Sequence, residues 1–358
     1  MKDIYYFANA IYQLSYALPV YNQIGGTFVV RDKRRYYHFK RYFHSLAKFG
    51  EKTFLRTPKV IIRSRREVQS LDGVIFFLSN SVVPSSNYGN SPTIFHEHGT
   101  SDKRYGGGFQ EKAKRKLSKY DYIFLSGPKN QKRLEEMDLH FSKAKLVKVG
   151  GLRFDAYLSG DFSREKELKR LKIKDTSRKN ILYAPTWSFG KGTLKKYGYR
   201  FAKEITQKFN LIIRPHYHDQ SYSTYLKLKC MLEGIKHVYF SNSSNIIKHD
   251  TFNDFMIADL MISDMSSVIY EFLIMQRPII IAKNDFDDAH KMPKEMDIKQ
   301  NADLFNEQDD ILKMVEDNLN HPRFNEVYKK MVEASFYVQG SAVQRAVDFI
   351  NDLRRDEK

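Results

Sequence analysis

A buried strand gives way to a helix within the stretch ADLMISDMSSVIYEF, residues 258–272. The apolar run 260–263 has the length and composition of a buried strand, and the polar residues Asp264, Ser266 and Ser267 follow it before an apolar helical pattern begins. Ser266 or Ser267 is placed to cap that helix, so that backbone amides and hydroxyls face whatever lies at the strand end. The stretch therefore predicts the strand, turn and helix of a parallel α/β sheet.

The same alternation of apolar runs and helical stretches continues along the whole chain. In the first half we predict strands at 4–7, 27–30, 74–78, 93–96, 122–125 and 146–149. In the second half we predict strands at 181–184, 211–214, 238–240, 260–263 and 278–282. Helices are predicted at 10–24 with a restart near Pro19, and at 110–119, 129–137, 199–208, 220–233, 267–276 and 340–354. Strands that alternate with helices favour parallel sheets, so the predicted fold class is α/β.

The length of the chain indicates two lobes. A chain of 358 residues favours about two domains, and the polar segment 159–179 has the composition of a hinge or connecting helix. We predict two Rossmann-like lobes at 1–160 and 161–336, and we expect the terminal segment 337–358 to form a helix that packs back on the first lobe.

Composition excludes several classes of protein. Hydrophobic residues make up 42% of the chain and charged residues 28%, which rules out intrinsic disorder or a fibrous repeat as a description of the whole. The single cysteine, Cys230, cannot form an intramolecular disulfide and favours a reducing cytoplasm. The His-x-His pairs His96/His98 and His216/His218 raise a metal hypothesis, but no carboxylate pattern completes a site, so we predict neither a metal nor a cofactor.

Positive charge is concentrated near the N-terminus. The formal net charge is +18, and residues 31–66 contain thirteen Lys and Arg with aromatic residues interleaved among them. Three interpretations remain open: a solvated basic helix whose rings face the core, an anionic membrane surface, and, least favoured, nucleic acid. On the membrane interpretation, the predicted binding residues are Arg34, Arg35, Lys40 and Arg41.

Four segments that could carry chemistry each follow a predicted strand, which is where open α/β sheets bind their ligands. The first, IFHEHGT at 94–100, places His96 and His98 before Gly99. A histidine in a turn is suited to general base catalysis, because its pKa lies near neutrality. The alternative is an ordinary solvated histidine.

The second and third segments bring an aromatic ring and cationic groups to strand ends. YAPTWS at 183–188 contains Trp187, the one tryptophan of the chain, which could stack on a base or fill the core between the lobes. LIIRPHYH at 211–218 brings Arg214 and His216 to the end of a buried strand, a pairing suited to a diphosphate.

The fourth segment is the opening stretch 258–272, and it leaves two questions open. Asp264, Ser266 and Ser267 could bind an anion at the start of the helix or could only cap it. Glu271 could accept hydrogen bonds from ribose hydroxyls or could pair with Arg277.

The four segments, in this order and spacing, resemble the CDP-glycerol glycerophosphotransferase family of teichoic acid and capsule synthesis. The resemblance runs from about His96 to Ala282 and rests on four motifs. These are His-Gly-Thr at 98–100, Tyr-Ala-Pro-Thr-Trp at 183–187, Arg-x-His at 214–216 and Asp-x-Ser-Ser at 264–267. It implies the glycosyltransferase B architecture, in which two Rossmann-like lobes face a cleft, with the acceptor on the first lobe and the nucleotide donor on the second.

The resemblance also implies a reaction. His98 would take the proton from an acceptor hydroxyl as that hydroxyl attacks the β-phosphorus of CDP-glycerol, or of a similar CDP-alditol, and releases CMP. The implied catalytic residues are His98, Arg214 and His216. The implied donor-binding residues are Thr186, Trp187, Arg214, His216, Asp264, Ser266, Ser267 and Glu271, and those on the acceptor side are His96, Gly99 and Thr100.

The expected partners are the CDP-linked donor, a lipid-linked saccharide acceptor and an anionic membrane surface. The expected location is cytoplasmic, peripheral on the inner face of the cell membrane. Two alternatives remain: a nucleotide-sugar-dependent glycosyltransferase of the same fold, and a basic membrane- or RNA-binding protein without enzymatic activity.

Overall fold

The computed structural model describes residues 1–48, 57–64, 66–78, 91–96, 116–136, 145–160, 163–188, 191–243, 250–264, 266–284 and 294–355. These residues form two compact units. Unit 1 runs from the N-terminus through Leu158 and resumes at Ser335, and unit 2 lies between them in the sequence, from Ser159 to Ala334.

Unit 1 is built on a parallel sheet with the strand order β3-β2-β1-β4-β5-β6-β7 among the described residues. The strands are β1 (Asp3–Phe7), β2 (Thr27–Val30), β3 (Lys59–Ile62), β4 (Gly73–Phe77), β5 (Thr93–His96), β6 (Tyr122–Leu125) and β7 (Lys145–Lys148). Every residue of the central strands β4 and β5 is buried, as expected for strands covered on both faces.

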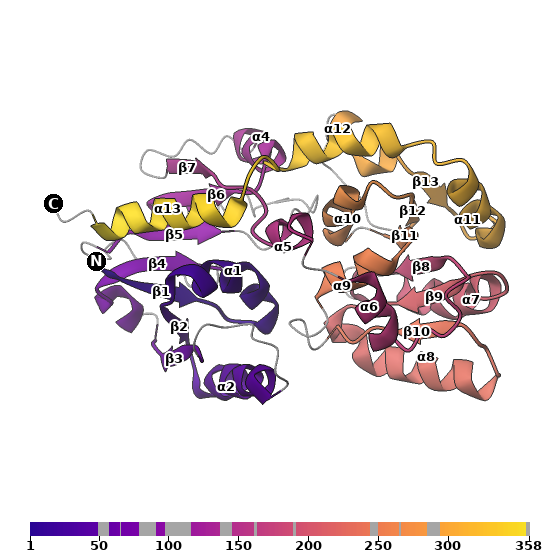
Figure 1. The fold of residues 1–358 in the computed structure, drawn as a ribbon, viewed down its shortest axis with the longest axis horizontal. Helices are drawn as coiled ribbons and strands as arrows, with labels where there is room; N and C mark the ends of the chain where they lie inside the picture. The colour runs from indigo at the N-terminus through magenta and orange to yellow at the C-terminus, as the bar shows by residue number, and fades with distance from the viewer. Residues whose placement is uncertain are drawn as a thin grey trace. The chain divides into compact units, whose positions relative to one another are not determined.

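The helices of unit 1 cover this sheet (Figure 1). They are α1 (Leu14–Ile24), α2 (Lys33–Lys48), α4 (Pro128–Glu136), α5 (Phe154–Leu158) and α13 (Ala342–Arg355). The predicted restart near Pro19 is wrong, because Pro19 lies inside a continuous α1. A 3₁₀ turn at Ile11–Gln13 precedes this helix, and α1 packs against α13.

Helix α13 belongs to unit 1 although it comes at the end of the sequence. Asp155 caps its first turn, since the carboxylate accepts hydrogen bonds from Ala342 N (3.0 Å) and Val343 N (2.8 Å). Further along the helix, the ring of Phe349 lies 5.0 Å from that of Tyr122 on β6. The terminal helix is therefore attached to α5 at its start and to the sheet of unit 1 further along.

Unit 2 has a second parallel sheet, with the order β10-β9-β8-β11-β12-β13 among the described residues. The strands are β8 (Asn180–Tyr183), β9 (Asn210–Ile213), β10 (Val238–Phe240), β11 (Leu260–Ser263), β12 (Ile279–Ala282) and β13 (Asp303–Phe305). The helices are α6 (Arg164–Arg170), α7 (Leu194–Ile205), α8 (Gln220–Leu232), α9 (Thr251–Ile257), α10 (Val268–Phe272), α11 (Ile311–Asn320) and α12 (Asn325–Ser335). The α/β prediction of two parallel sheets with helices is confirmed.

The sequence missed two strands, and both lie at sheet edges. Both strands are only partly buried. β3 contains the short apolar run 60–62, which the prediction passed over within the basic segment 31–66, and β13 has only two apolar residues, Leu304 and Phe305. Helix α7 begins at Leu194, five residues earlier than predicted, and buries Leu194, Tyr197 and Phe201 against the sheet. The helix predicted at 110–119 lies largely outside the described residues.

Candidate donor site at the strand ends of unit 2

Three neighbouring strands carry the predicted donor residues to one edge of the unit 2 sheet. β9, β8 and β11 are adjacent and parallel, so their carboxyl ends lie at the same edge. Thr186 and Trp187 follow β8, Arg214 and His216 follow β9, and Asp264 with Ser266 and Ser267 follows β11. This is the edge at which open parallel sheets bind ligands.

Asp264 holds the connection between β8 and α7. Its Oδ1 accepts a hydrogen bond from Thr186 N (2.8 Å), and its Oδ2 accepts from Thr193 N (2.9 Å) and Thr193 Oγ1 (3.0 Å). The residue is completely buried, and Tyr183 OH donates to Thr193 Oγ1 from below (2.8 Å). The carboxylate therefore fixes where Thr186 and Trp187 begin their turn.

Gly192 allows this connection to close tightly. A Cβ atom at position 192 would lie 1.9 Å from the carbonyl oxygen of Thr186, so any larger residue would force the two parts of the connection apart. The sequence analysis did not select Gly192, because an isolated glycine in a polar turn carries no signal of such an approach.

Arg214 lies in a buried network of charges. Its side chain is 7% exposed, and its Nη1 donates to Asp254 Oδ2 (2.6 Å) and Ser241 Oγ (3.2 Å). Arg170 binds the other oxygen of Asp254 (2.6 Å) and also pairs with Glu167. The guanidinium of Arg214 is thus bound to α9 through Asp254.

His216 and Trp187 form an aromatic cluster with His218 at the strand ends. The Trp187 ring centroid lies 5.9 Å from that of His216 and 5.1 Å from that of His218. His216 Nδ1 accepts from His218 N at 3.3 Å, which holds the first imidazole in place. Trp187 and His216 are both half-buried, so this cluster presents ring faces and imidazole nitrogens at the edge of the sheet.

The two serines of the Asp-x-Ser-Ser motif lie at the start of α10. Ser267 occupies the N-cap position without a side-chain capping hydrogen bond, and both serines are half-buried. The side chain of Ser267 therefore does not provide the cap that the capping alternative requires of it. Glu271 is buried, and Arg277 donates from its Nη1 to backbone carbonyl groups that include Phe255 O (3.0 Å).

Of the predicted acceptor-side residues, His96 is the one that the structure describes. His96 ends β5 with 2% of its surface exposed, and its ring packs against Tyr16 (5.8 Å between centroids) and Phe76 (6.1 Å). The predicted residues His98, Gly99 and Thr100 lie outside the described residues. Arg153, which follows strand β7 and was not among the predicted site residues, lies over the Tyr16 ring, with its Cζ 5.1 Å from the ring centroid.

Helix α2 divides its residues between the core and a basic outer face. Phe39, Tyr42 and Phe43 are buried, which supports the interpretation in which the aromatic rings face the core. Among the other described rings of α2, Tyr36 is half-buried and Tyr37 is 67% exposed. The exposed cations of α2 include Lys33, Arg34, Lys40 and Arg41.

Two side chains near the start of α2 have altered environments. Arg35 pairs with Asp32 and donates its Nε to Asn9 O (2.9 Å), so it is less accessible than the other predicted membrane-binding residues. Partial burial, and then the nearby charges of Arg41 and Arg34, lower the pKa of His38 below its usual value.

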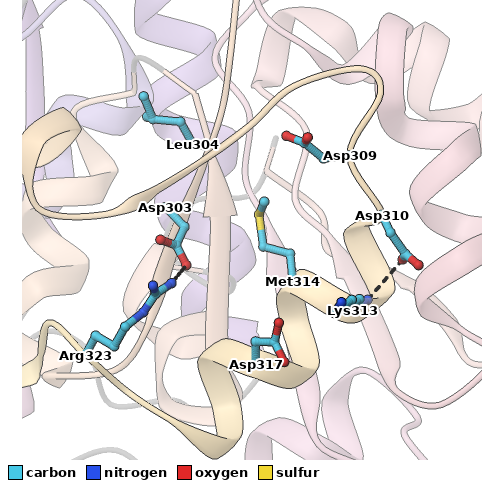
Figure 2. A pocket seen from close by; sticks show the side chains of 8 residues that line it. All are labelled: Asp303, Leu304, Asp309, Asp310, Lys313, Met314, Asp317 and Arg323. Carbon is cyan, nitrogen blue, oxygen red and sulfur yellow. Dashed lines mark hydrogen bonds and ion pairs between the residues drawn. The ribbon is translucent and has the colours of Figure 1, made fainter.

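A surface pocket of about 300 Å³ lies away from these motifs, at the edge strand β13 and helix α11 (Figure 2). Its lining is mostly charged: Asp303, Leu304, Asp309, Asp310, Lys313, Met314, Asp317 and Arg323. Asp303 pairs with Arg323, and Asp310 accepts from Lys313 N (3.0 Å), so local partners already use several of these charges. The pocket contains none of the predicted site residues.

The described residues contain neither a bilayer-spanning helix nor a metal-binding cluster. No helix among them combines the length and apolar character needed to cross a bilayer. No group of three or more His, Cys, Asp or Glu side chains in the same part of the chain could hold a metal ion.

The fold has known counterparts, and a family match identifies the chain. Two Rossmann-like α/β units are the fold of the glycosyltransferase B type, which this chain shares with solved structures of low sequence identity. Residues 28–352 match the family described as CDP-Glycerol:Poly(glycerophosphate) glycerophosphotransferase, and the chain belongs to that family.

Individual relatives are distant in sequence, and their names agree with the family match. A teichoic acid glycerol-phosphate transferase of Staphylococcus aureus is 24% identical over 193 residues, which cover 53% of this chain and 47% of that protein. A teichoic acid poly(glycerol phosphate) polymerase of Bacillus spizizenii is 26% identical over 223 residues, 57% of this chain and 50% of that protein. The chain spans half or less of the length of these curated relatives.

A solved structure matches over nearly the whole chain. The wall teichoic acid polymerase TagF aligns with a TM-score of 0.66 at 17% identity, covering 98% of this chain and 88% of that one. At this level of identity the likeness concerns the fold.

Proposed function

We propose that this protein transfers glycerol phosphate, or a related polyol phosphate, from a CDP-linked donor to a hydroxyl group of a lipid-linked saccharide or growing polymer in teichoic acid synthesis. The observation that carries the proposal is the convergence of three family motifs on the carboxyl ends of β9, β8 and β11. Adjacent parallel strands bring N–H and O–H groups together at one edge of the sheet, where they can donate hydrogen bonds to the phosphate oxygens of a nucleotide diphosphate.

The geometry favours some of the predicted donor ligands over others. His216, Ser266 and Ser267 are partly accessible at the strand ends and supply an imidazole and hydroxyls for the diphosphate. Trp187, in contact with the imidazoles, offers a ring face for the cytosine base. Thr186 and Glu271 are buried and would act from behind this surface.

Arg214 and Asp264 take a positioning role in this proposal. Asp254 binds the guanidinium of Arg214, and Thr186 and Thr193 donate to the carboxylate of Asp264. Arg214 therefore holds the end of β9 against α9, and Asp264 holds the turn that carries Trp187. Both residues shape the donor site without contacting the donor.

In the chemical step, the oxygen of the acceptor hydroxyl forms a bond to the β-phosphorus of the donor. The bond from that phosphorus to the bridging oxygen breaks, and CMP leaves with the bridging oxygen. His98 takes the hydroxyl proton, and the groups around the phosphates stabilise the charge on the phosphoryl oxygens.

We further propose that unit 1 docks on the cytoplasmic face of the membrane through the basic outer face of α2. Lys33, Arg34, Lys40 and Arg41 project into solvent, and each cation near an anionic surface contributes about 1 kcal/mol. Docking brings the enzyme to an acceptor that cannot leave the bilayer.

Release of CMP tests the proposed reaction. The protein is incubated with CDP-glycerol and a lipid-linked acceptor, and separately with UDP-sugars. We expect CMP from the first mixture and no UDP from the second. His216→Ala should lower the rate by about 10²-fold or more, whereas the exposed His321→Ala serves as the matched control. UDP release without CMP would support the glycosyltransferase instead.

A further inference from the structure

Helix α8 of unit 2 presents an apolar ridge to solvent. Tyr225, Leu228, Met231 and Leu232 are exposed by 56%, 49%, 67% and 77% of their surfaces. Their spacing of three and four residues places Tyr225, Leu228 and Leu232 on one side of the helix, with Met231 beside them. The opposite side is buried in the unit 2 core through Leu226 and Cys230. Such a concentration of large apolar side chains on one surface helix marks an interaction site.

Positive charge flanks the ridge. Lys227 is exposed on the side of Met231, and Lys229 lies over the ring of Tyr199 at 3.6 Å from the centroid. Glu233 accepts a hydrogen bond from the Tyr199 hydroxyl and raises the pKa of Tyr199 to about 12. The carboxylate that follows the helix is thus engaged with α7, and α8 itself contains no Asp or Glu.

The size and charge of the ridge disfavour a second copy of the chain as its partner. Taking roughly 200 Å² for a large side chain, the exposed fractions amount to about 500 Å², whereas a stable interface buries about 800 Å² on each partner. Pairing of two α8 helices would also bring the lysines of one copy toward those of the other. A bilayer requires no minimum interface area and brings no like charges together, because apolar side chains enter the acyl boundary while lysines remain among anionic headgroups.

We propose that the α8 ridge inserts into the interfacial layer of an anionic lipid bilayer. This inference rests on the proposed membrane docking and adds to it a second contact, on unit 2, that is driven by the hydrophobic effect and not by charge. The outer face of α2 attracts headgroups electrostatically, whereas α8 contributes burial of apolar surface. The two contributions respond differently to salt, because 1 M salt shortens the Debye length to about 3 Å and leaves apolar burial in place.

Vesicle sedimentation separates the two contributions. The intact protein is mixed with vesicles of equal parts phosphatidylglycerol and phosphatidylethanolamine at about 0.05 M and 1 M salt. The α8 variant is Leu228→Ser/Met231→Ser/Leu232→Ser, the α2 variant is Arg34→Glu/Lys40→Glu/Arg41→Glu, and Leu158→Ser removes an equally exposed leucine elsewhere. We expect the α8 variant to lose at least tenfold of the wild-type partitioning that persists in 1 M salt. Leu158→Ser should match the wild type, and the α2 variant should lose mainly the binding seen in low salt.

A fluorescent probe tests insertion directly. Met231→Cys is labelled with a polarity-sensitive nitrobenzoxadiazole group. The buried Cys230 is replaced in the same variant by alanine, so that Cys at position 231 is the one thiol available to the label. A blue shift on addition of the vesicles supports insertion.

The proposal is overturned if the α8 variant, with an unchanged melting temperature, partitions like the wild type in 1 M salt. It is equally overturned if the probe is unshifted by vesicles and light scattering shows a dimer that the α8 variant abolishes, since the ridge is then a contact between copies. Partitioning does not depend on CMP release, so loss of the proposed activity and loss of the proposed insertion are observed separately.

Discussion

Neutralising Asp254 should destabilise unit 2 strongly. Asp254 is completely buried and binds Arg214 and Arg170, while Glu167 pairs with Arg170. Two cations and two anions therefore balance in the interior. Asp254→Asn leaves a net positive charge where the side chains of Arg214 and Arg170 are only 7% and 14% exposed.

The size of the effect follows from the cost of an uncompensated buried charge. Removing one partner of a buried ion pair costs about 3–5 kcal/mol. For a domain of about 150–250 residues each kcal/mol lowers the melting temperature by about 2–4 °C, so we expect a decrease of about 6–20 °C. The exposed Asp317→Asn, in the same unit, should stay within about 0.5 kcal/mol of the wild type.

Denaturant unfolding and calorimetry of the intact chain measure these changes, and a double-mutant cycle isolates the pair. Asp254→Asn, Arg214→Gln and the double variant should give a coupling energy of about 0.5–3 kcal/mol. The reasoning is refuted if Asp254→Asn melts within about 1 °C of the wild type. It also fails if Arg214→Gln keeps wild-type stability but raises the KM for CDP-glycerol more than tenfold, because Arg214 would then serve the donor phosphates directly.

Three further predictions concern other polar groups. Asp264→Asn should cost about 1.5–3 kcal/mol of stability for each charge-assisted hydrogen bond lost and should raise the KM for the donor; an unchanged KM in a destabilised variant would argue against its effect on the donor site. Asp155→Ala removes the cap of α13 and should cost about 1 kcal/mol in urea unfolding, and equal stability would contradict the capping role. The pKa of His38 is lowered first by burial and then by two arginines, so Arg34→Gln/Arg41→Gln should raise it partway toward the ordinary value in an NMR titration. A pKa that falls or stays constant in that variant would exclude the charge contribution.

The lowered pKa of His38 also makes the free energy of unfolding depend on pH. Because the unfolded chain binds a proton at this residue at higher pH than the folded chain does, folding loses stability as the pH falls through the ordinary histidine pKa. The pH dependence measured for the wild type minus that of His38→Gln should therefore show a loss on the acidic side of that value.

Much of the fold was predictable from local patterns. Strands 93–96, 122–125, 238–240 and 260–263 were predicted at their observed bounds. Buried parallel strands are short apolar runs between polar turns, and this pattern is visible without any tertiary information. β3 and β13 were missed for different reasons: the apolar run of β3, 60–62, lies within the basic segment 31–66, and β13 has only two apolar residues.

The sequence alone determined the α/β class, the family resemblance and the set of polar residues that follow the strands of unit 2. It could not decide which of them face a ligand. Arg214 and His216 are two residues apart, yet the first is bound in the interior by Asp254 and the second meets Trp187 at the edge of the sheet. Asp264 was predicted as a donor ligand, and its carboxylate accepts hydrogen bonds from Thr186 and Thr193. Only the tertiary structure decides which groups these side chains meet, because the partner of each charge comes from a distant part of the chain, and a buried charge must be compensated by a group that folding brings to it.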